Sequence, residues 1–344
     1  LNGIRRILIT ILVAMGVGAL FIVAIGENPI DAYAALFRGA FDGELRLGTT
    51  LAGFTPLLLT SIAFAVAAKA GAFNVGVEGE VFLGGITAAY IGINWTFLPK
   101  PALYVACFVG AMVVAAAWAF IPAVLRAYYN VNEVCTTILM NTVALYITSY
   151  LVSGPMSAGT ANAQSLPVTV RLYQFMKPSS VNVGIFIAAI TVIVIIFMLQ
   201  KSSWGYKIRT VGLNPTHADY VGIDSKKVFV GAMMLSGMLG GMAGCIEVLG
   251  VHGYFLNNFA TGLGSNGMLA ALIVKNNMVS TPFMAFFLAV LKSGAMGMQQ
   301  TTGAPKSLVD TITAVFIIIA TMETAFQFTK KRKKKTEEKK EEKA

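Results

Sequence analysis

The sequence predicts an all-α, polytopic membrane protein. Of its 344 residues, 56% are hydrophobic and 12% are charged, whereas soluble domains carry about 25% charged residues. The mean hydropathy is +0.72. Apolar runs close to the roughly 20 residues that cross a bilayer as a helix recur about ten times along the chain.

These runs predict transmembrane helices, in order along the chain. The first run follows a short basic start and is interpreted as a retained first helix. One run is too short to span a bilayer and predicts a half-helix or a re-entrant segment, at 267–275. The runs cover 7–25, 48–68, 75–93, 102–125, 134–152, 184–200, 228–250, 267–275, 280–297 and 308–328.

Basic residues predict the orientation, because lysine and arginine favour cytoplasmic loops. They gather at Arg5, Arg6, Lys69, Arg126, 201–209, 226–227 and 330–335. Both termini are therefore expected in the cytoplasm, with the connections at 26–47 and 154–183 outside. The chain divides into a permease domain at 1–329 and a charged cytoplasmic tail at 330–344. That tail is a solvated stop-transfer segment, or one attracted to anionic membrane lipid.

Composition and motifs argue against several functions. The net charge of +10 arises partly from the tail, so it does not point to nucleic acid. Three cysteines and two histidines lie too far apart for a metal site or a disulfide framework. The chain holds no GxxxxGK[ST] phosphate loop. Any ATP hydrolysis is therefore expected on a separate chain, and we predict no catalytic residue, no metal and no cofactor on this one.

The stretch from Gly71 to Tyr90 is the predicted functional centre. Gly71, Gly76 and Gly79 disfavour a continuous helix, since ordering glycine costs the most backbone freedom. Glu78 and Glu80 follow at the edge of an apolar run. Non-helical backbone inside a membrane is tolerated only where protein or water covers it. This segment is therefore expected inside a helix bundle, where it lines an interior space.

A faint internal repeat contains a second such segment. A long helix (48–68), a glycine-rich break (71–84) and two further helices form one half of the chain. A long helix (228–250), a glycine-rich break (262–275) and two further helices form the other half. Interrupted segments at corresponding places in two halves indicate a transport path near the membrane midplane; otherwise both are ordinary glycine-rich loops.

Two later helices carry notable stripes. Glu133, Thr137, Asn141 and Thr148 fall near one helical face, where they line a pathway or bond a neighbouring helix; Glu133 alternatively caps the helix. The run at 228–250 carries overlapping GxxxG spacings at 237–241 and 240–244, which predict close helix packing. Glu247, one turn further on, is a pathway residue or an interfacial one.

The connection at 201–227 is the longest predicted cytoplasmic loop. Pro215 is expected to begin a short helix with Asn214 as its N-cap. Its apolar and aromatic residues indicate either docking to a soluble partner or packing on the chain's own bundle.

Five stretches in order resemble the permease subunits of bacterial ABC importers. Within the family of ribose and branched-chain amino acid permeases, they are most similar to the nucleoside group, which is associated with lipoproteins of the basic-membrane type. The stretches are GAFNVGVEGE (71–80), VNEVCTTILMN (131–141), LVSGP (151–155), VGLNPTHADYVGI (211–223) and GAMMLSGMLGGMAG (231–244).

The resemblance implies a complex and a mechanism. The expected partners are cytoplasmic ATPase subunits that bind ATP, a second permease subunit of a different sequence and an external substrate-binding lipoprotein. The loop at 205–223 would contain the coupling helix, with the path between two permease subunits. We predict nucleoside import by alternating access, with path residues Asn74, Glu78, Asn141 and Glu247 and coupling residues Gly212, Leu213, Asn214, Pro215 and His217.

Alternatives remain. The same architecture serves simple sugars or branched-chain amino acids. A secondary transporter could instead use Glu78 or Glu247 as a proton site, without a partner. An intramembrane enzyme is disfavoured, because the apolar segments hold no nucleophile–base pair and no metal cluster.

Overall fold

The computed structural model describes residues 16, 19–20, 22–23, 28–302 and 314. Within these residues the chain is helical, and β-structure is limited to three isolated bridges. Three predicted segments lie outside the described residues. They are the helix at 7–25 except for five positions, the helix at 308–328 except for one position, and the tail at 330–344. The proposed division at 329/330 lies outside them too.

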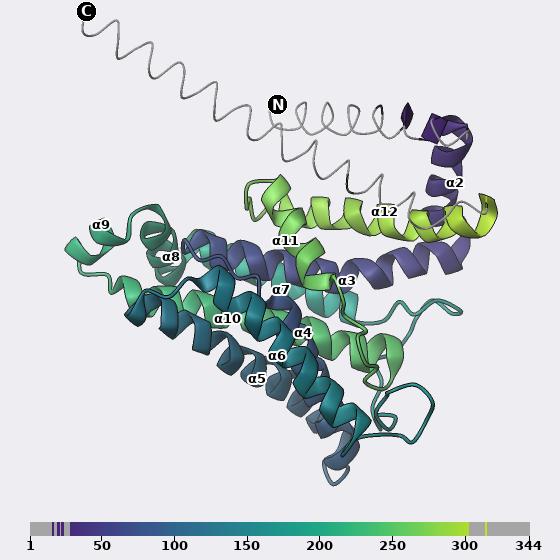
Figure 1. Ribbon diagram of the computed structural model, residues 1–344, viewed down its shortest axis with the longest axis horizontal. Helices are drawn as coiled ribbons and strands as arrows, with labels where there is room; N and C mark the ends of the chain where they lie inside the picture. Colours follow the sequence, from purple (N-terminus) through teal and green to yellow (C-terminus); the bar gives the residue numbers. More distant parts are fainter. Residues whose placement is uncertain (1–15, 17–18, 21, 24–27, 303–313, 315–344) are drawn as a thin grey trace, which may run out of the picture. The chain divides into compact units, whose positions relative to one another are not determined.

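Figure 1 labels the helices and colours them along the sequence, from purple to yellow. Six described segments are long and apolar enough to span a membrane, namely α3, α5, α6, α7, α10 with η1, and α12. A multi-pass helical membrane fold is therefore confirmed, whereas about ten spans are not. The bounds are α2 Pro29–Phe41, α3 Gly43–Lys69, α4 Val77–Asn94, α5 Lys100–Tyr129, α6 Glu133–Ser153, α7 Gly184–Lys201, α8 Ser203–Leu213, α9 Pro215–Tyr220, α10 Ser225–Ile246, η1 Glu247–His252, α11 Leu263–Ile273 and α12 Thr281–Thr302.

The chain forms two compact units, Gly43–Val290 and a smaller unit built from both ends of the sequence. In the smaller unit, Gly39 of α2 packs against the backbone of Gly294 and Gly297 in α12. Helix α2 corrects the prediction of an irregular connection at 26–47. Asn28 caps it by accepting a hydrogen bond from the Ile30 N–H (3.0 Å), and proline follows at the first helical position, where its missing N–H costs nothing.

Helix α10 is the packing centre of the larger unit. Gly237 and Gly241 pack against the Ala115 and Ala111 carbonyls of α5, so those two helices run antiparallel. Gly240 packs on the first turn of α4, and Gly244 packs one turn further along it, so these two helices run parallel. The predicted role of the GxxxG spacings in helix packing is confirmed, because a side chain at these positions would collide with a neighbouring helix.

Both predicted breaks are present, with different limits. Irregular backbone between α3 and α4 covers only 70–76, because Gly79 and Gly84 lie within α4, where they allow close contact with α6 and α10. The second break precedes its half-helix, at 253–262, whereas the sequence placed it at 262–275. The predicted half-helix is confirmed as α11, which has 11 residues and is too short to span.

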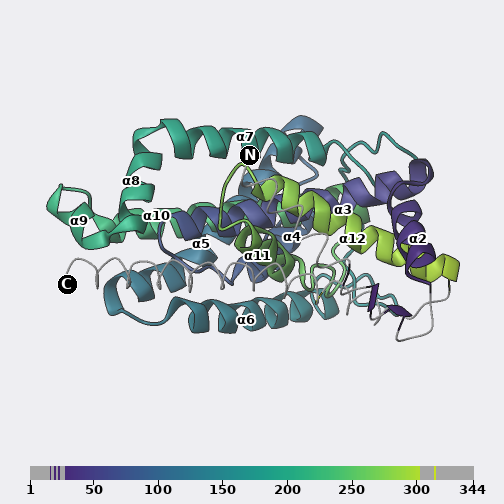
Figure 2. The same cartoon turned by 90° about the horizontal axis from the view of Figure 1, so that it is seen from above.

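Helices α6 and α7 lie on opposite flanks of the larger unit, with α3 and α10 between them (Figure 2). Burial agrees, since 78% of the most apolar stretch of α3 is buried, against 17% for α6 and 28% for α7. Helices α8 and α9 lie at the end of the unit where α3 ends and α10 begins (Figure 2). The connection at 154–183 joins the other ends of α6 and α7, opposite the end that carries α8 and α9.

Candidate transport site and coupling loop

The first turns of α4 and α11 meet at Glu78. A Cβ atom added to Gly264 would lie 2.6 Å from the Glu78 backbone nitrogen, so only glycine permits this approach. The Ser265 hydroxyl donates a hydrogen bond to Glu78 Oε2 (3.3 Å), and Glu78 is half-buried. Unpaired N–H groups at helix starts attract anionic and hydrogen-bond-accepting groups. Of the four predicted path residues, Glu78 is the one that lies at this meeting point, and its path role stays a prediction.

Asn74 ties the first break to α10. Its amide nitrogen donates to Glu80 Oε1 and to Ser236 Oγ, both at 2.9 Å, and its Oδ1 accepts from the Gly76 N–H (2.9 Å). Asn74, Glu80 and Ser236 are almost completely buried. Glu80 Oε2 has no hydrogen-bond partner among the described residues and faces Gly240. These contacts support a role in shaping the break; the path role of Asn74 stays a prediction.

Asn141 holds the same break from the side of α6. Its side chain donates to the Val75 carbonyl (2.9 Å) and accepts from the Gly79 N–H (2.8 Å). The sequence offered two roles for the polar residues of α6, lining a pathway or bonding a neighbouring helix. Asn141 has the second role. Thr137 and Thr148 bond carbonyls of their own helix, and Glu133 forms an ion pair with Arg126 (3.0 Å).

Replacing Asn141 by leucine is expected to destabilise the protein, because it leaves the Val75 carbonyl and the Gly79 N–H without a partner. Each unsatisfied buried group costs about 1–3 kcal/mol. The thermal unfolding midpoint of the purified protein should fall clearly. Asn94→Leu is the matched control, since Asn94 is exposed and bonds only the Tyr90 carbonyl of its own helix (2.9 Å). Equal midpoints for the two variants would contradict this role of Asn141.

Glu247 lies apart from the other three predicted path residues. It begins the π-helical turn η1, is 8% exposed, and has its Oε2 atom 3.6 Å from His252 Nε2. The Phe259 ring contacts both His252 and Phe82 of α4, with centroids 5.8 and 5.7 Å apart. Within the described residues, no hydrogen bond or ion pair joins Glu247 to Asn74, Glu78 or Asn141. His252 and Phe259 were not singled out from the sequence, because only the fold brings them beside Glu247.

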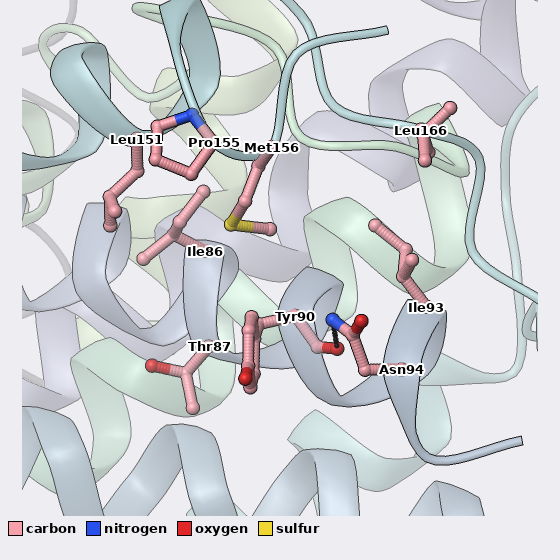
Figure 3. A pocket seen from close by; sticks show the side chains of 9 residues that line it. All are labelled: Ile86, Thr87, Tyr90, Ile93, Asn94, Leu151, Pro155, Met156 and Leu166. Atoms are coloured by element: carbon pink, nitrogen blue, oxygen red, sulfur yellow. Dashed lines mark hydrogen bonds between the residues drawn. The ribbon is translucent and has the colours of Figure 1, made fainter.

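A separate pocket of about 420 Å³ lies at the far end of α4 (Figure 3). Its polar groups come from α4, namely Thr87, Tyr90 and Asn94, and it contains none of the predicted path residues. The other lining residues come from α4, the end of α6 and the connection at 154–183: Ile86, Ile93, Leu151, Pro155, Met156 and Leu166. Its mainly apolar lining with a few polar groups resembles small-molecule sites in general.

The predicted coupling loop forms two helices, α8 and α9. The expected start of α9 is confirmed: Pro215 is its first residue, and the Asn214 side chain accepts a hydrogen bond from the His217 N–H (3.0 Å). Helix α8 was not predicted. Its Ile208 and Val211 are buried, whereas Leu213 is 88% exposed, and Pro215 and His217 are exposed beside it. One side of the loop thus packs on its own bundle, and the α8–α9 corner projects.

Gly212 connects this corner to the first break. A Cβ atom at Gly212 would collide with the Lys69 carbonyl oxygen, and the added Cβ of Gly71 would lie 3.6 Å from Gly212 Cα. Gly71 has φ +82°, a conformation that favours glycine. Helix α8 therefore rests directly on the backbone that leads from α3 into the break and on to Glu78.

Residues 46–321, most of the chain, match the family described as the permease component of branched-chain amino acid transport systems. The chain belongs to this permease family. It is accordingly a multi-pass membrane transport subunit and not an enzyme, as the sequence predicted.

Three relatives are similar to this permease over most of their length. It is 32% identical to the guanosine ABC transporter permease protein of Bacillus subtilis, over 93% of this chain and 94% of the relative. It is 30% identical to the nucleoside ABC transporter permease protein of Lactococcus lactis, over 92% and 91%. It is also 32% identical to the glucose ABC transporter permease protein of Haloferax volcanii, over 90% and 85%.

Proposed function

We propose that this permease is the membrane subunit of an ATP-driven importer that carries nucleosides by alternating access. The observation that carries this proposal is the direct contact of the α8–α9 corner with the break before α4. A partner that moves this corner would move the backbone at Lys69 and Gly71. Since Glu78 stands at the start of α4, the same movement would reach the candidate path.

The partners proposed for it are cytoplasmic ATPase subunits, a second permease subunit of different sequence and an external binding lipoprotein. The exposed Leu213 and Tyr220 (88% and 85%) suit a docking surface for the ATPase, because burying large apolar side chains against a partner is favourable. Both termini would then lie in the cytoplasm, with the α8–α9 corner on the same side. ATP binds the partner ATPase, and the permease itself carries no cofactor.

Nucleosides are the favoured substrates, because two of the three relatives above are named for guanosine or nucleosides. A nucleoside is neutral and rich in hydrogen-bonding groups, which suits Glu78 and the Ser265 hydroxyl at the meeting point of α4 and α11. Asn74, Asn141 and Glu247 remain proposed path residues. A simple sugar is the second candidate, since the Haloferax volcanii relative is named for glucose.

Uptake of radiolabelled nucleosides, glucose and branched-chain amino acids by cells with and without the gene tests this substrate. Loss of nucleoside uptake alone is expected. If cells without the gene keep nucleoside uptake and lose glucose uptake, the substrate is a sugar and the proposed importer architecture still holds. Unlabelled guanosine and glucose, added in excess, provide the competition control.

A further inference from the structure

A groove of about 480 Å³ lies in the Gly43–Val290 unit, between α5, the start of α7 and the connection at 154–183. All of its lining side chains are hydrocarbon or aromatic, and their only polar atoms are two tyrosine hydroxyls. The groove contains none of the predicted path or coupling residues. Helix α5 contributes half of the lining, with Tyr104, Val105, Phe108 and Val109.

The groove lies in the half of the bundle away from the α8–α9 corner. Helices α5 and α10 run antiparallel, as Gly237 packs on the Ala115 carbonyl and Gly241 on the Ala111 carbonyl. Helix α10 follows α9 directly, so the start of α5 lies at the opposite end. The first ten residues of α5 span about 14 Å, close to half of a hydrocarbon core of roughly 30 Å. The groove is therefore at the depth of one leaflet.

Aromatic residues mark the bilayer surface at the start of α5. Trp95 and Phe97 precede the helix with ring centroids 6.3 Å apart, and Phe97 is 77% exposed. In the groove itself, Tyr173 is 72% exposed, and the Tyr104 hydroxyl donates to the Arg171 carbonyl (2.6 Å). Tryptophan and tyrosine are enriched where a membrane meets water. The groove thus begins just below that boundary.

A lysine stands at the same end of α5. Lys100, Tyr104 and Phe108 are spaced four residues apart, so they share one face of the helix. Lys100 is exposed and forms no ion pair among the described residues. A lysine ammonium binds phosphate well. From the bilayer surface inward, this stripe changes from cationic to apolar, as a phospholipid changes from phosphate to acyl chain.

The surroundings of the groove favour lipid over substrate. Exposed mid-helix residues on either side are hydrocarbon, namely Val113 of α5 and Ile190 and Ile193 of α7, as expected for contact with lipid. A nucleoside does not suit the groove. The Tyr104 hydroxyl already has a partner, and most hydrogen-bonding groups of a nucleoside would have none in this apolar lining. An acyl chain fills such a groove without that cost.

We propose that the groove binds one anionic phospholipid, with its phosphate on Lys100 and one acyl chain against Phe108 and Ile187. The lipid comes from the leaflet away from the α8–α9 corner. Its chain joins α5 to α7 and to the connection at 154–183. The inference goes beyond the proposed function, because it requires only that the chain spans a membrane and holds for any transported substrate.

Native mass spectrometry of the full-length permease tests the headgroup. The protein is purified in detergent and mixed with equal amounts of phosphatidylglycerol and phosphatidylcholine, and the lipids that stay bound are identified. The wild type should retain phosphatidylglycerol in preference, and Lys100→Gln should lower its occupancy several-fold. Lys177→Gln is the matched control, because Lys177 is an exposed lysine of the connection that does not line the groove. Equal phosphatidylglycerol occupancy in the two variants would overturn the proposal.

Photo-crosslinking maps the acyl chain. The permease is reconstituted in phosphatidylcholine vesicles with a trace of phosphatidylglycerol that carries a diazirine midway along one acyl chain. Ile187 and Phe186 are neighbours at one depth, but Ile187 lines the groove and is half-buried, whereas Phe186 is 57% exposed outside it. Ultraviolet light should label Ile187 more than Phe186, and Lys100→Gln should reduce the Ile187 label several-fold.

Bulk lipid would give a different pattern of labels. It would label the exposed Phe186 more than Ile187, and equally in the wild type and in Lys100→Gln, which would overturn the proposal. Neither experiment involves a transported substrate. Failure of this inference is therefore distinguishable from failure of the proposed nucleoside transport, which the uptake assay measures.

Discussion

Gly212→Ala is expected to reduce nucleoside uptake about tenfold or more while the protein remains in the membrane. The added methyl group would collide with the Lys69 carbonyl, which forces α8 away from the backbone that leads into the first break. Overpacking of this kind costs about 1–3 kcal/mol, and about 1.4 kcal/mol corresponds to a tenfold effect. Uptake should therefore fall about tenfold or more, measured per permease molecule in membrane vesicles.

Gly53→Ala is the matched control for this variant. Gly53 lies inside α3, and an added Cβ there would meet no atom within 4 Å. Alanine is favoured over glycine in a helix interior by about 1 kcal/mol, so Gly53→Ala should transport normally. Wild-type uptake by Gly212→Ala would show that the close contact between α8 and the break does not carry the coupling.

The second large effect is expected at Asn74. Asn74→Leu conserves volume but removes the partner of Glu80 Oε1, of Ser236 Oγ and of the Gly76 N–H. Glu80 is only 1% exposed, and each buried polar group that loses its partner costs about 1–3 kcal/mol. Little folded protein should remain, measured by fluorescence-detected size-exclusion chromatography in detergent.

Glu80→Gln should be tolerated in the same assay. A glutamine oxygen can still accept the Asn74 hydrogen bond, and its uncharged amide replaces the Oε2 atom that has no partner among the described residues. A severe loss of folded protein with Glu80→Gln and a mild loss with Asn74→Leu would contradict this account. The Glu80 carboxylate would then be the essential group, rather than the hydrogen bonds made by Asn74.

Much of this fold could be predicted from local sequence signals. The glycines at 237–244 indicated close helix packing, and Asn214-Pro215 indicated the start of α9, because each signal depends only on neighbouring residues. Helix α2 was missed because its 13 residues are too few to span and its charges resembled a loop. The breaks were misplaced by several residues because glycine serves two purposes: Gly71 permits a turn, whereas Gly79 and Gly84 permit contact within a regular helix.

The site was less predictable than the fold. Glu78 was chosen for its charge beside a break, but its approach to Ser265 joins residues that are 187 positions apart. Asn74 and Asn141 were chosen as polar groups in apolar surroundings. The sequence does not reveal that both bond the backbone or side chains around the same break, since that depends on how α6 and α10 pack against α4.

The central claim is that this permease moves its substrate only within an ATP-driven complex. The most direct test is guanosine uptake by proteoliposomes that contain the permease, either alone or with its co-purified ATPase, second permease subunit and binding lipoprotein. Uptake should require the complete complex and ATP on the ATPase side, and a proton gradient alone should have no effect. Uptake by the permease alone, driven by a proton gradient in the absence of ATP, would contradict the account and identify an ion-coupled carrier.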